Sequence, residues 1–147
     1  MQKKILSVND RGFIPVEHTA DIGLKLWGQV PEDLFYSGLM GLRYLADRSL
    51  CNNAVLEARA IEIDSPDMES LLVDFLNELL YMINSENWIP AEIDDICITG
   101  SRLICSIMGS RSDSGPGTGR EIKAATYHNL EIRKNDDSMS TVVYFDI

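Results

Sequence analysis

The chain has 147 residues, 45% of them hydrophobic and 24% charged. This composition suits one compact domain and excludes a collagen, a coiled coil and a long disordered tail. A count of 13 Lys and Arg against 23 Asp and Glu gives a formal net charge of -10, which repels a phosphate backbone and argues against direct, stable nucleic-acid binding. An acidic surface also suits a protein that merely has to stay soluble.

Two short strands and a helix are predicted in the first third of the chain. Residues 12–18 and 22–28 have strand-like character, and apolar and polar residues alternate along the second of these runs. A proline at the first helical position, acidic residues after it and an apolar face predict a helix over 31–47. Gly38 and Gly41 lower helix propensity in its middle, which indicates close packing against a sheet.

A strand over 54–64 and a second helix are predicted next. Ser65, Pro66 and Asp67 form a helix start, with the Ser65 hydroxyl as the cap for free backbone N–H groups and proline where no donor is needed. Six apolar residues recur behind it at the spacing of one helical face. They are Leu72, Phe75, Leu76, Leu79, Leu80 and Ile83.

The rest of the chain predicts strands. Residues 89–99 and 102–108 form a hairpin around a Gly-Ser pair. Residues 109–120 are rich in Ser and Gly and predict a loop. The segments 122–133 and 141–145 are expected to pair with each other.

This order of elements predicts an α+β fold, with a mostly antiparallel mixed sheet and two helices packed on one face. No internal repeat and no long linker interrupts the chain, so residues 1–147 are expected to form a single domain.

The sequence predicts a cytoplasmic protein without a membrane partner. No apolar run approaches the roughly 20 residues that cross a bilayer, and the first ten residues lack the apolar core of an export signal. Cys51, Cys97 and Cys105 are odd in number and lack a CxxC spacing, so they predict neither a disulfide framework nor a zinc site. We expect them to be reduced and buried.

The junction of the first two strands carries His18 and Asp21. An imidazole and a carboxylate at a loop can serve a ligand, because the core does not need them there. The alternative is a turn in which the aspartate bonds to its own backbone.

The sequence ends with Asp146 and Ile147 at the end of a predicted strand. The Asp146 side chain and, if the chain stops there, the Ile147 main chain each offer a carboxylate. Hard divalent cations such as Ca2+, Mg2+ or Mn2+ prefer such oxygens, so Asp21 and this end would form an acidic metal site if the two strands are neighbours. The alternative is a frayed end.

A third cluster runs from Lys123 to His128. On a strand, Lys123 and Tyr127 share one face, while Thr126 and His128 share the other. Lysine and imidazole together suit an anionic or metal-bound ligand, and the alternative is an ordinary half-solvated strand edge. The glycines of 115–119 lack the order of a phosphate-binding loop and precede a strand, so we reject that function for them.

Four blocks of sequence together resemble the archease family. They are EHTADIG at 17–23, LVDFLNELLY at 72–81, IKAATYHNL at 122–130 and the final FDI at 145–147. The blocks follow the family's order over nearly the whole chain, and the first and third are long and specific.

This resemblance implies a small cytosolic α+β protein that is not itself an enzyme. Family members assist the guanylylating RNA ligase of tRNA splicing and RNA repair, which uses GTP and a divalent metal, and they promote guanylylation of the ligase and its repeated turnover. By matching motif, the resemblance implies Asp21, Asp146 and Ile147 as metal-binding residues. It implies Lys123 as an activating residue, with His18 and His128 as further partner contacts.

Two departures from the family pattern accompany the resemblance. Many relatives carry a longer charged loop before the lysine block, where this chain has the Ser- and Gly-rich segment 110–119. The lysine block also reads Ala124-Ala125 where many relatives have Ala-Val or Ala-Pro, a difference that should disturb packing little.

Two functions of other classes stay open from the residues alone. One is a free-standing metal-dependent nucleotide hydrolase, with His18 or His128 as general base. The other is a general chaperone or binding module for several nucleic-acid enzymes.

Overall fold

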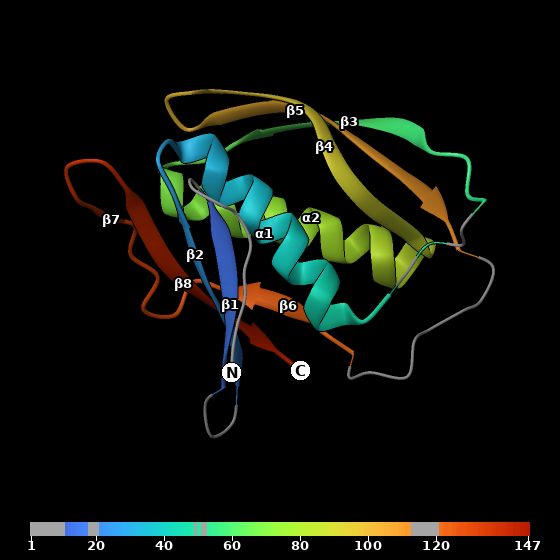
Figure 1. Ribbon diagram of the computed structural model, residues 1–147, viewed down its shortest axis with the longest axis horizontal. Helices are drawn as coiled ribbons and strands as arrows, with labels where there is room; N and C mark the ends of the chain where they lie inside the picture. The colour runs from blue at the N-terminus through green and yellow to red at the C-terminus, as the bar shows by residue number, and fades with distance from the viewer. Residues whose placement is uncertain (1–10, 18–20, 49, 51–52, 113–120) are drawn as a thin grey trace.

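The computed structural model describes residues 11–17, 21–48, 50, 53–112 and 121–147. Its class is α+β, as predicted, but the described strands form two antiparallel sheets rather than one. The two helices of this described part lie between the sheets and contact both of them (Figure 1). The prediction of helices on one face of a single sheet therefore gives way to a layered β-α-β arrangement.

The large sheet carries both ends of the described chain. Its described strands run in the order β1, β2, β8 and β6, and β7 pairs with β8 beside β6. Their bounds are β1 Gly12–Glu17, β2 Ile22–Gly28, β6 Ala124–Thr126, β7 Arg133–Lys134 and β8 Met139–Asp146.

The small sheet has the order β3, β5 and β4. Its strands are β3 Glu57–Asp64, β4 Trp88–Thr99 and β5 Arg102–Arg111. The predicted β4–β5 hairpin is confirmed, and Gly100 has a φ of 63° at its turn, a conformation that glycine adopts without steric cost. β5 extends into the segment predicted as a loop, of which 113–120 lie outside the described residues.

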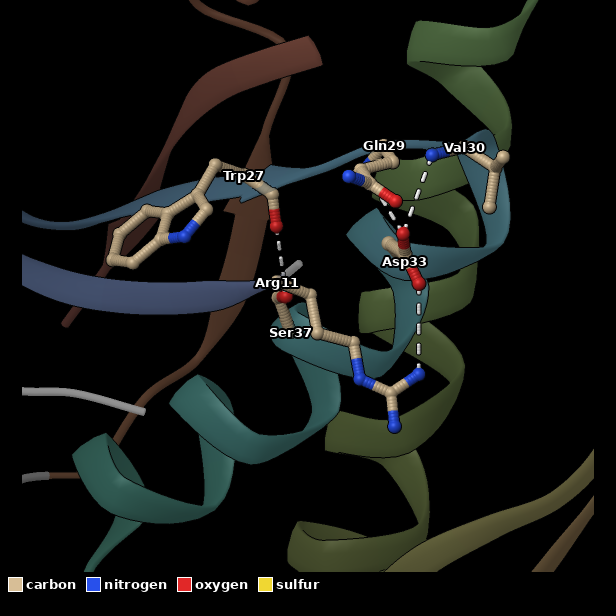
Figure 2. A network of polar contacts seen from close by, with 6 residues as sticks. All are labelled: Arg11, Trp27, Gln29, Val30, Asp33 and Ser37. Atoms are coloured by element: carbon tan, nitrogen blue, oxygen red, sulfur yellow. Dashed lines mark hydrogen bonds and ion pairs between the residues drawn. The ribbon is translucent and has the colours of Figure 1, made fainter. Parts of the chain in front are cut away.

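Helix α1 (Pro31–Ala46) is confirmed to within one residue of its predicted end. The residue before it, Val30, has no side-chain acceptor for the free N–H groups of the first turn. Asp33, inside the first turn, instead holds the two residues before the helix, since its carboxylate accepts hydrogen bonds from the backbone N–H groups of Gln29 at 2.9 Å and Val30 at 3.2 Å (Figure 2). Asp47, with a φ of 51°, ends the helix.

Helix α2 (Met68–Glu86) is capped by Asp67, not by Ser65 as the sequence suggested. The Asp67 side chain accepts a hydrogen bond from the backbone N–H of Ser70 at 2.7 Å. The Ser65 hydroxyl instead donates to the Asp74 carboxylate at 2.6 Å. Ser65 and Asp67 both carry oxygens that could cap the helix, and Asp67, which directly precedes the first turn, is the N-cap.

The predicted apolar face of α2 is buried throughout. Leu71, Val73 and Met82, which lie off that face, are buried as well. A helix against one sheet needs a single apolar stripe, whereas a helix between two sheets must bury a wider surface. The extra burial follows from the two-sheet arrangement.

The two glycines of α1 permit close packing on different neighbours. A Cβ atom at Gly41 would lie 2.8 Å from Cδ1 of Leu24 in β2, which confirms the expected approach to a sheet. A Cβ at Gly38 would lie 3.1 Å from Cδ2 of Leu76, so this glycine accommodates helix α2 first.

Two strand predictions need correction at their edges. β3 begins at Glu57, three residues later than predicted. The predicted strand 122–133 is broken into β6 and β7 by a turn in which the Leu130 N–H donates to the Tyr127 carbonyl at 3.1 Å and Asn129 has a φ of 54°. Within the described ranges, no helix is long and apolar enough to span a membrane.

Candidate functional site

The ends of β2 and β8 bring two distant carboxylates together. These strands pair antiparallel, and their last paired residues are Ile22 and Phe145. Asp21 directly precedes Ile22 and Asp146 directly follows Phe145, so the same register, continued by one residue, places the two aspartates opposite each other. The adjacency on which the acidic-site hypothesis depends is therefore present in the fold.

A hollow of about 250 Å³ lies at this end of the large sheet. Asp21, Thr126, His128, Tyr144, Phe145 and Asp146 line it. Three predicted site residues, Asp21, His128 and Asp146, thus share one concave surface, although more than 100 positions separate the first from the others.

The alternation along the strands explains which side chains reach the hollow. Ala125 pairs with Phe145, and both are buried against the core. Thr126 pairs with Tyr144 in the next position and so lies on the opposite, outer face. The prediction that Thr126 shares its face with His128 agrees with their common place in the hollow.

Tyr144 forms one wall of the hollow because its neighbour across the strands is Gly23. A Cβ at Gly23 would lie 2.9 Å from Cδ1 of the Tyr144 ring. The absent side chain lets the aromatic ring lie flat over β2, and a larger residue would push it away.

The two carboxylates are electrostatically uncompensated in the described structure. Like charges directly across neighbouring strands repel each other. Within the described residues, no lysine or arginine forms an ion pair with Asp21 or Asp146. The arrangement therefore favours a cation from outside the described part of the chain.

His128 and Thr126 are linked to each other beside these carboxylates. The His128 backbone N–H donates to the Thr126 hydroxyl oxygen at 3.3 Å, and the exposed imidazole Nε2 lies 3.2 Å from the Asn129 side-chain nitrogen. The hollow thus combines two acids with a neutral hydroxyl and an imidazole.

The remaining predicted residues have different positions. The Lys123 backbone N–H donates to the Asp146 carbonyl at 2.8 Å, but the exposed Lys123 side chain does not line the hollow. Ile147 follows Asp146 and is 37% exposed. His18 lies outside the described residues.

Two asparagines of α2 hold the segment that frames the hollow, and no functional motif in the sequence singles them out. The Asn77 side-chain oxygen Oδ1 accepts from the Ala125 backbone N–H at 2.7 Å, and its side-chain nitrogen Nδ2 donates to the Ala125 backbone carbonyl at 3.3 Å. The Asn84 amide donates to the Ile122 carbonyl at 2.8 Å. In the sequence, each asparagine is a polar residue next to the leucine face of a predicted helix. That position does not indicate which residue its side chain will bond.

Tyr127 joins the same segment to α2 through a third contact. Its hydroxyl donates to the Asp74 carboxylate at 2.6 Å. This hydrogen bond, with smaller contributions from burial and from the negative charges of Asp74 and Asp67, raises the pKa of Tyr127. Tyr127 therefore anchors the turn after β6 and lies on the helix side, away from His128.

The donor set suits a hard cation but is incomplete. Carboxylate and hydroxyl oxygens are the ligands that Ca2+, Mg2+ and Mn2+ prefer. The described ranges contain no group of three or more His, Cys, Asp or Glu side chains placed to hold a metal ion. A cation between Asp21 and Asp146 would need main-chain oxygen, water or another molecule to complete its coordination.

Comparisons with known proteins agree over nearly the whole chain. The sequence model of the Archease protein family matches residues 13–147. A protein from Methanosarcina barkeri, named protein archease, is 33% identical, with 97% of this chain and 100% of the relative covered.

Two solved structures have a similar fold. A solution structure of a Methanobacterium thermoautotrophicum protein is similar with a TM-score of 0.71 and 30% identity, covering 92% of this chain and 99% of the other. The crystal structure of an archease from Thermotoga maritima, described as a possible chaperone, has a TM-score of 0.66 and 28% identity, with 91% and 96% covered.

Proposed function

The chain belongs to the archease family, and from that premise we propose that it is an accessory protein of tRNA splicing and RNA repair. In this proposal it activates a GTP-dependent RNA ligase by promoting guanylylation of the ligase and its multiple turnover. It is not an enzyme itself, and it meets GTP through the ligase, in the cytoplasm. The net charge of -10 supports a protein partner in preference to RNA.

One observation carries the proposal: Asp21, His128 and Asp146 meet in a single hollow at the end of the large sheet. Three strands are needed to bring them there, because Asp21 directly precedes β2, Asp146 ends β8, and β6 leads into the turn with His128. Two carboxylates opposite each other destabilise a sheet, so their placement supports a role in binding.

We propose that Asp21, Asp146 and the main chain of Ile147 hold a divalent cation, Ca2+, Mg2+ or Mn2+. When bound, such an ion neutralises the carboxylates and can coordinate phosphate oxygens of a nucleotide. Asp21 and Asp146 fix its place at the tip of the sheet. The incomplete donor set supports an ion shared with a partner, because ligands from a second molecule would complete it.

Lys123 and His128 take separate roles in this proposal. The two main-chain neighbours Lys123 and Asp146 are hydrogen-bonded, so the lysine lies near the proposed ion without competing for it. Its ammonium group would meet a phosphate or an acidic group of the ligase. His128 and His18 would form further contacts with the partner around the hollow.

The test is a time course of ligase guanylylation and RNA joining with substoichiometric amounts of this protein. We expect Asp21→Asn and Asp146→Asn to reduce stimulation about tenfold or more, in line with the loss of groups that support a metal. Asp137→Asn, which removes an exposed acid elsewhere in the chain, is the matched control. Full stimulation by both hollow variants would remove the acidic tip from the mechanism.

A nucleotide hydrolase is the second candidate, favoured by the imidazole of His128 beside two carboxylates. Purified protein with GTP and Mg2+ would then release phosphate without the ligase, and His128→Gln would abolish that release. Under the accessory proposal, no phosphate is released. A general chaperone, in turn, would bind many unrelated nucleic-acid enzymes in a pull-down.

A further inference from the structure

A second concave surface lies at the other end of the β1–β2 hairpin, away from the hollow. It has a volume of about 310 Å³. Its lining comes from the start of β1 and the residue before it, from α1 and from the first half of β4. We call it the α1 groove, and it is lined by Arg11, Gly12, Phe13, Tyr36, Ser37, Leu39, Met40, Glu92 and Ile93.

The floor of the α1 groove is apolar and partly exposed. Tyr36, Met40 and Tyr44 are four residues apart, so they form one stripe along the helix. Met40 is 46% exposed and Tyr44 63%. The Tyr44 ring extends the stripe toward Phe13, with ring centroids 5.8 Å apart. A contiguous apolar surface of this kind, rimmed by polar residues, is typical of an interaction site.

The one arginine that lines the groove is already neutralised. The Arg11 guanidinium lies 3.5 Å from the Asp33 carboxylate (Figure 2) and 3.9 Å from the centre of the Tyr36 ring. The Arg11 charge is therefore paired with Asp33 at the start of α1, and the planar guanidinium covers a face of the Tyr36 ring.

A second arginine near the groove, Arg43, forms a hydrogen bond with the backbone of β4. The Arg43 guanidinium donates to the Ala91 carbonyl at 3.1 Å. Burial lowers the pKa of Arg43, and the group faces the backbone of β4. The guanidinium keeps its charge at neutral pH, but its hydrogen bond directs it to the backbone of β4, and Arg43 does not line the groove.

The free charge on the β4 side is negative. Glu92 lines the groove, and Asp94 and Asp95 follow it on the same strand, all three exposed. Within the described chain, none of the three forms an ion pair. The groove thus has an apolar floor and an acidic wall, which complement a ligand with apolar and basic side chains.

The flanking strand edges argue against binding by addition of a strand. β4 has irregularities in register at Ala91 and Asp94, and β1 carries Pro15. Bulges, edge charges and proline are features that discourage strand pairing. Recognition in the α1 groove would therefore depend on side chains.

We propose that the α1 groove binds a segment of a partner protein in which apolar side chains are flanked by lysine or arginine. The segment would place its apolar residues on the Tyr36–Met40 stripe and its cations against Glu92. This inference does not rest on the ligase role or on the acidic hollow, which lies at the opposite end of the hairpin.

The probe is a twelve-residue peptide with interspersed Leu and Lys, compared with a copy in which Glu replaces every Lys. Titration into the ¹⁵N-labelled chain should shift amide signals of α1 and β4 around the groove. We expect Glu92→Lys to weaken binding of the Lys peptide at least threefold and to strengthen binding of the Glu peptide. Met40→Ser should weaken binding of both peptides.

Matched controls separate the groove from general charge attraction. Glu78→Lys changes the net charge equally at an exposed position of α2, and Val55→Ser removes an apolar side chain that is 83% exposed. Equal effects of Glu92→Lys and Glu78→Lys would overturn the proposal. So would a shift map away from the groove, or a dimer in sedimentation that Met40→Ser dissociates, because a second copy would then be the occupant.

Discussion

Replacing Asn77 by leucine should destabilise the protein strongly, because the Asn77 amide takes the place of a neighbouring strand beside β6. Its side chain bonds both the N–H and the C=O of Ala125, at 2.7 and 3.3 Å. Ala125 is only 5% exposed, so water cannot replace the lost partners. A buried backbone group without a partner costs roughly 1–3 kcal/mol, which gives about 3 kcal/mol for the pair when the longer bond is weighted less.

For a chain of 147 residues, this loss corresponds to a decrease in Tm of about 6–12 °C. Leucine has nearly the size of asparagine, so no large cavity contributes. Urea unfolding and thermal unfolding measure the change, and hydrogen exchange at Ala125 should accelerate. Glu78→Gln, at the next and exposed position of the helix, is the control and should be neutral. A loss below about 0.5 kcal/mol for Asn77→Leu would refute the reasoning, because that is the range of ordinary surface substitutions.

Three further predictions concern other parts of the chain. The raised pKa of Tyr127 means that the stability from its bond to Asp74 is fully present below about pH 10 and is lost as pH rises through the folded-state value. Alkaline unfolding curves should therefore fall more steeply for the wild type than for Tyr127→Phe. Gly109→Ala should cost about 2 kcal/mol in urea unfolding, because its Cβ would lie 2.4 Å from a backbone carbonyl oxygen, and unchanged stability would contradict this packing. The expectation of buried cysteines holds for Cys105 but is wrong for Cys97, which is exposed. Burial, then the charge of Asp95, raises the pKa of Cys105 to about 12, so iodoacetamide at pH 8 should label Cys97 and spare Cys105 in peptide mapping.

The helices were predictable because their signals are local. The 3.6-residue period of the Leu72–Ile83 face and the proline at the start of α1 act within a few turns of chain. The choice of cap was not predictable, because Ser65 and Asp67 both have suitable oxygens. Their roles depend on Asp74, which binds the Ser65 hydroxyl and leaves Asp67 for the helix.

The division into two sheets could not be read from the strand patterns. Alternation indicates that a strand has one buried face, but not which strands share that face. β3 and β2 both alternate, yet β3 pairs with β5 and β2 with β8. The burial of Leu71 and Val73, off the expected face of α2, accompanies the second covering layer, but burial is known only from the structure.

The charged residues of the acidic hollow could be predicted from the sequence, but the uncharged residues that line it could not. Motif resemblance indicates Asp21 and Asp146, and the pairing of β2 with β8 brings them to the same end of the sheet. Tyr144 and Thr126 were not expected to line it, since their place follows from register across three strands. The Asn77 clamp was equally hidden, because its partner lies 48 positions along the chain.

Within the described residues, the two carboxylates of the hollow form no ion pair, which supports the proposed cation. Some acids elsewhere in the described chain have a basic neighbour, since Arg59 meets Glu86 at 2.7 Å and Arg102 meets Glu62 at 3.2 Å. Others, such as Glu92 of β4, form no ion pair within that part of the chain but do not line the hollow. The nearest described lysine in the register, Lys123, bonds Asp146 through its backbone alone and does not line the hollow. Opposed carboxylates with no basic partner reduce stability locally, and a bound cation would reverse that effect because it attracts both groups at once.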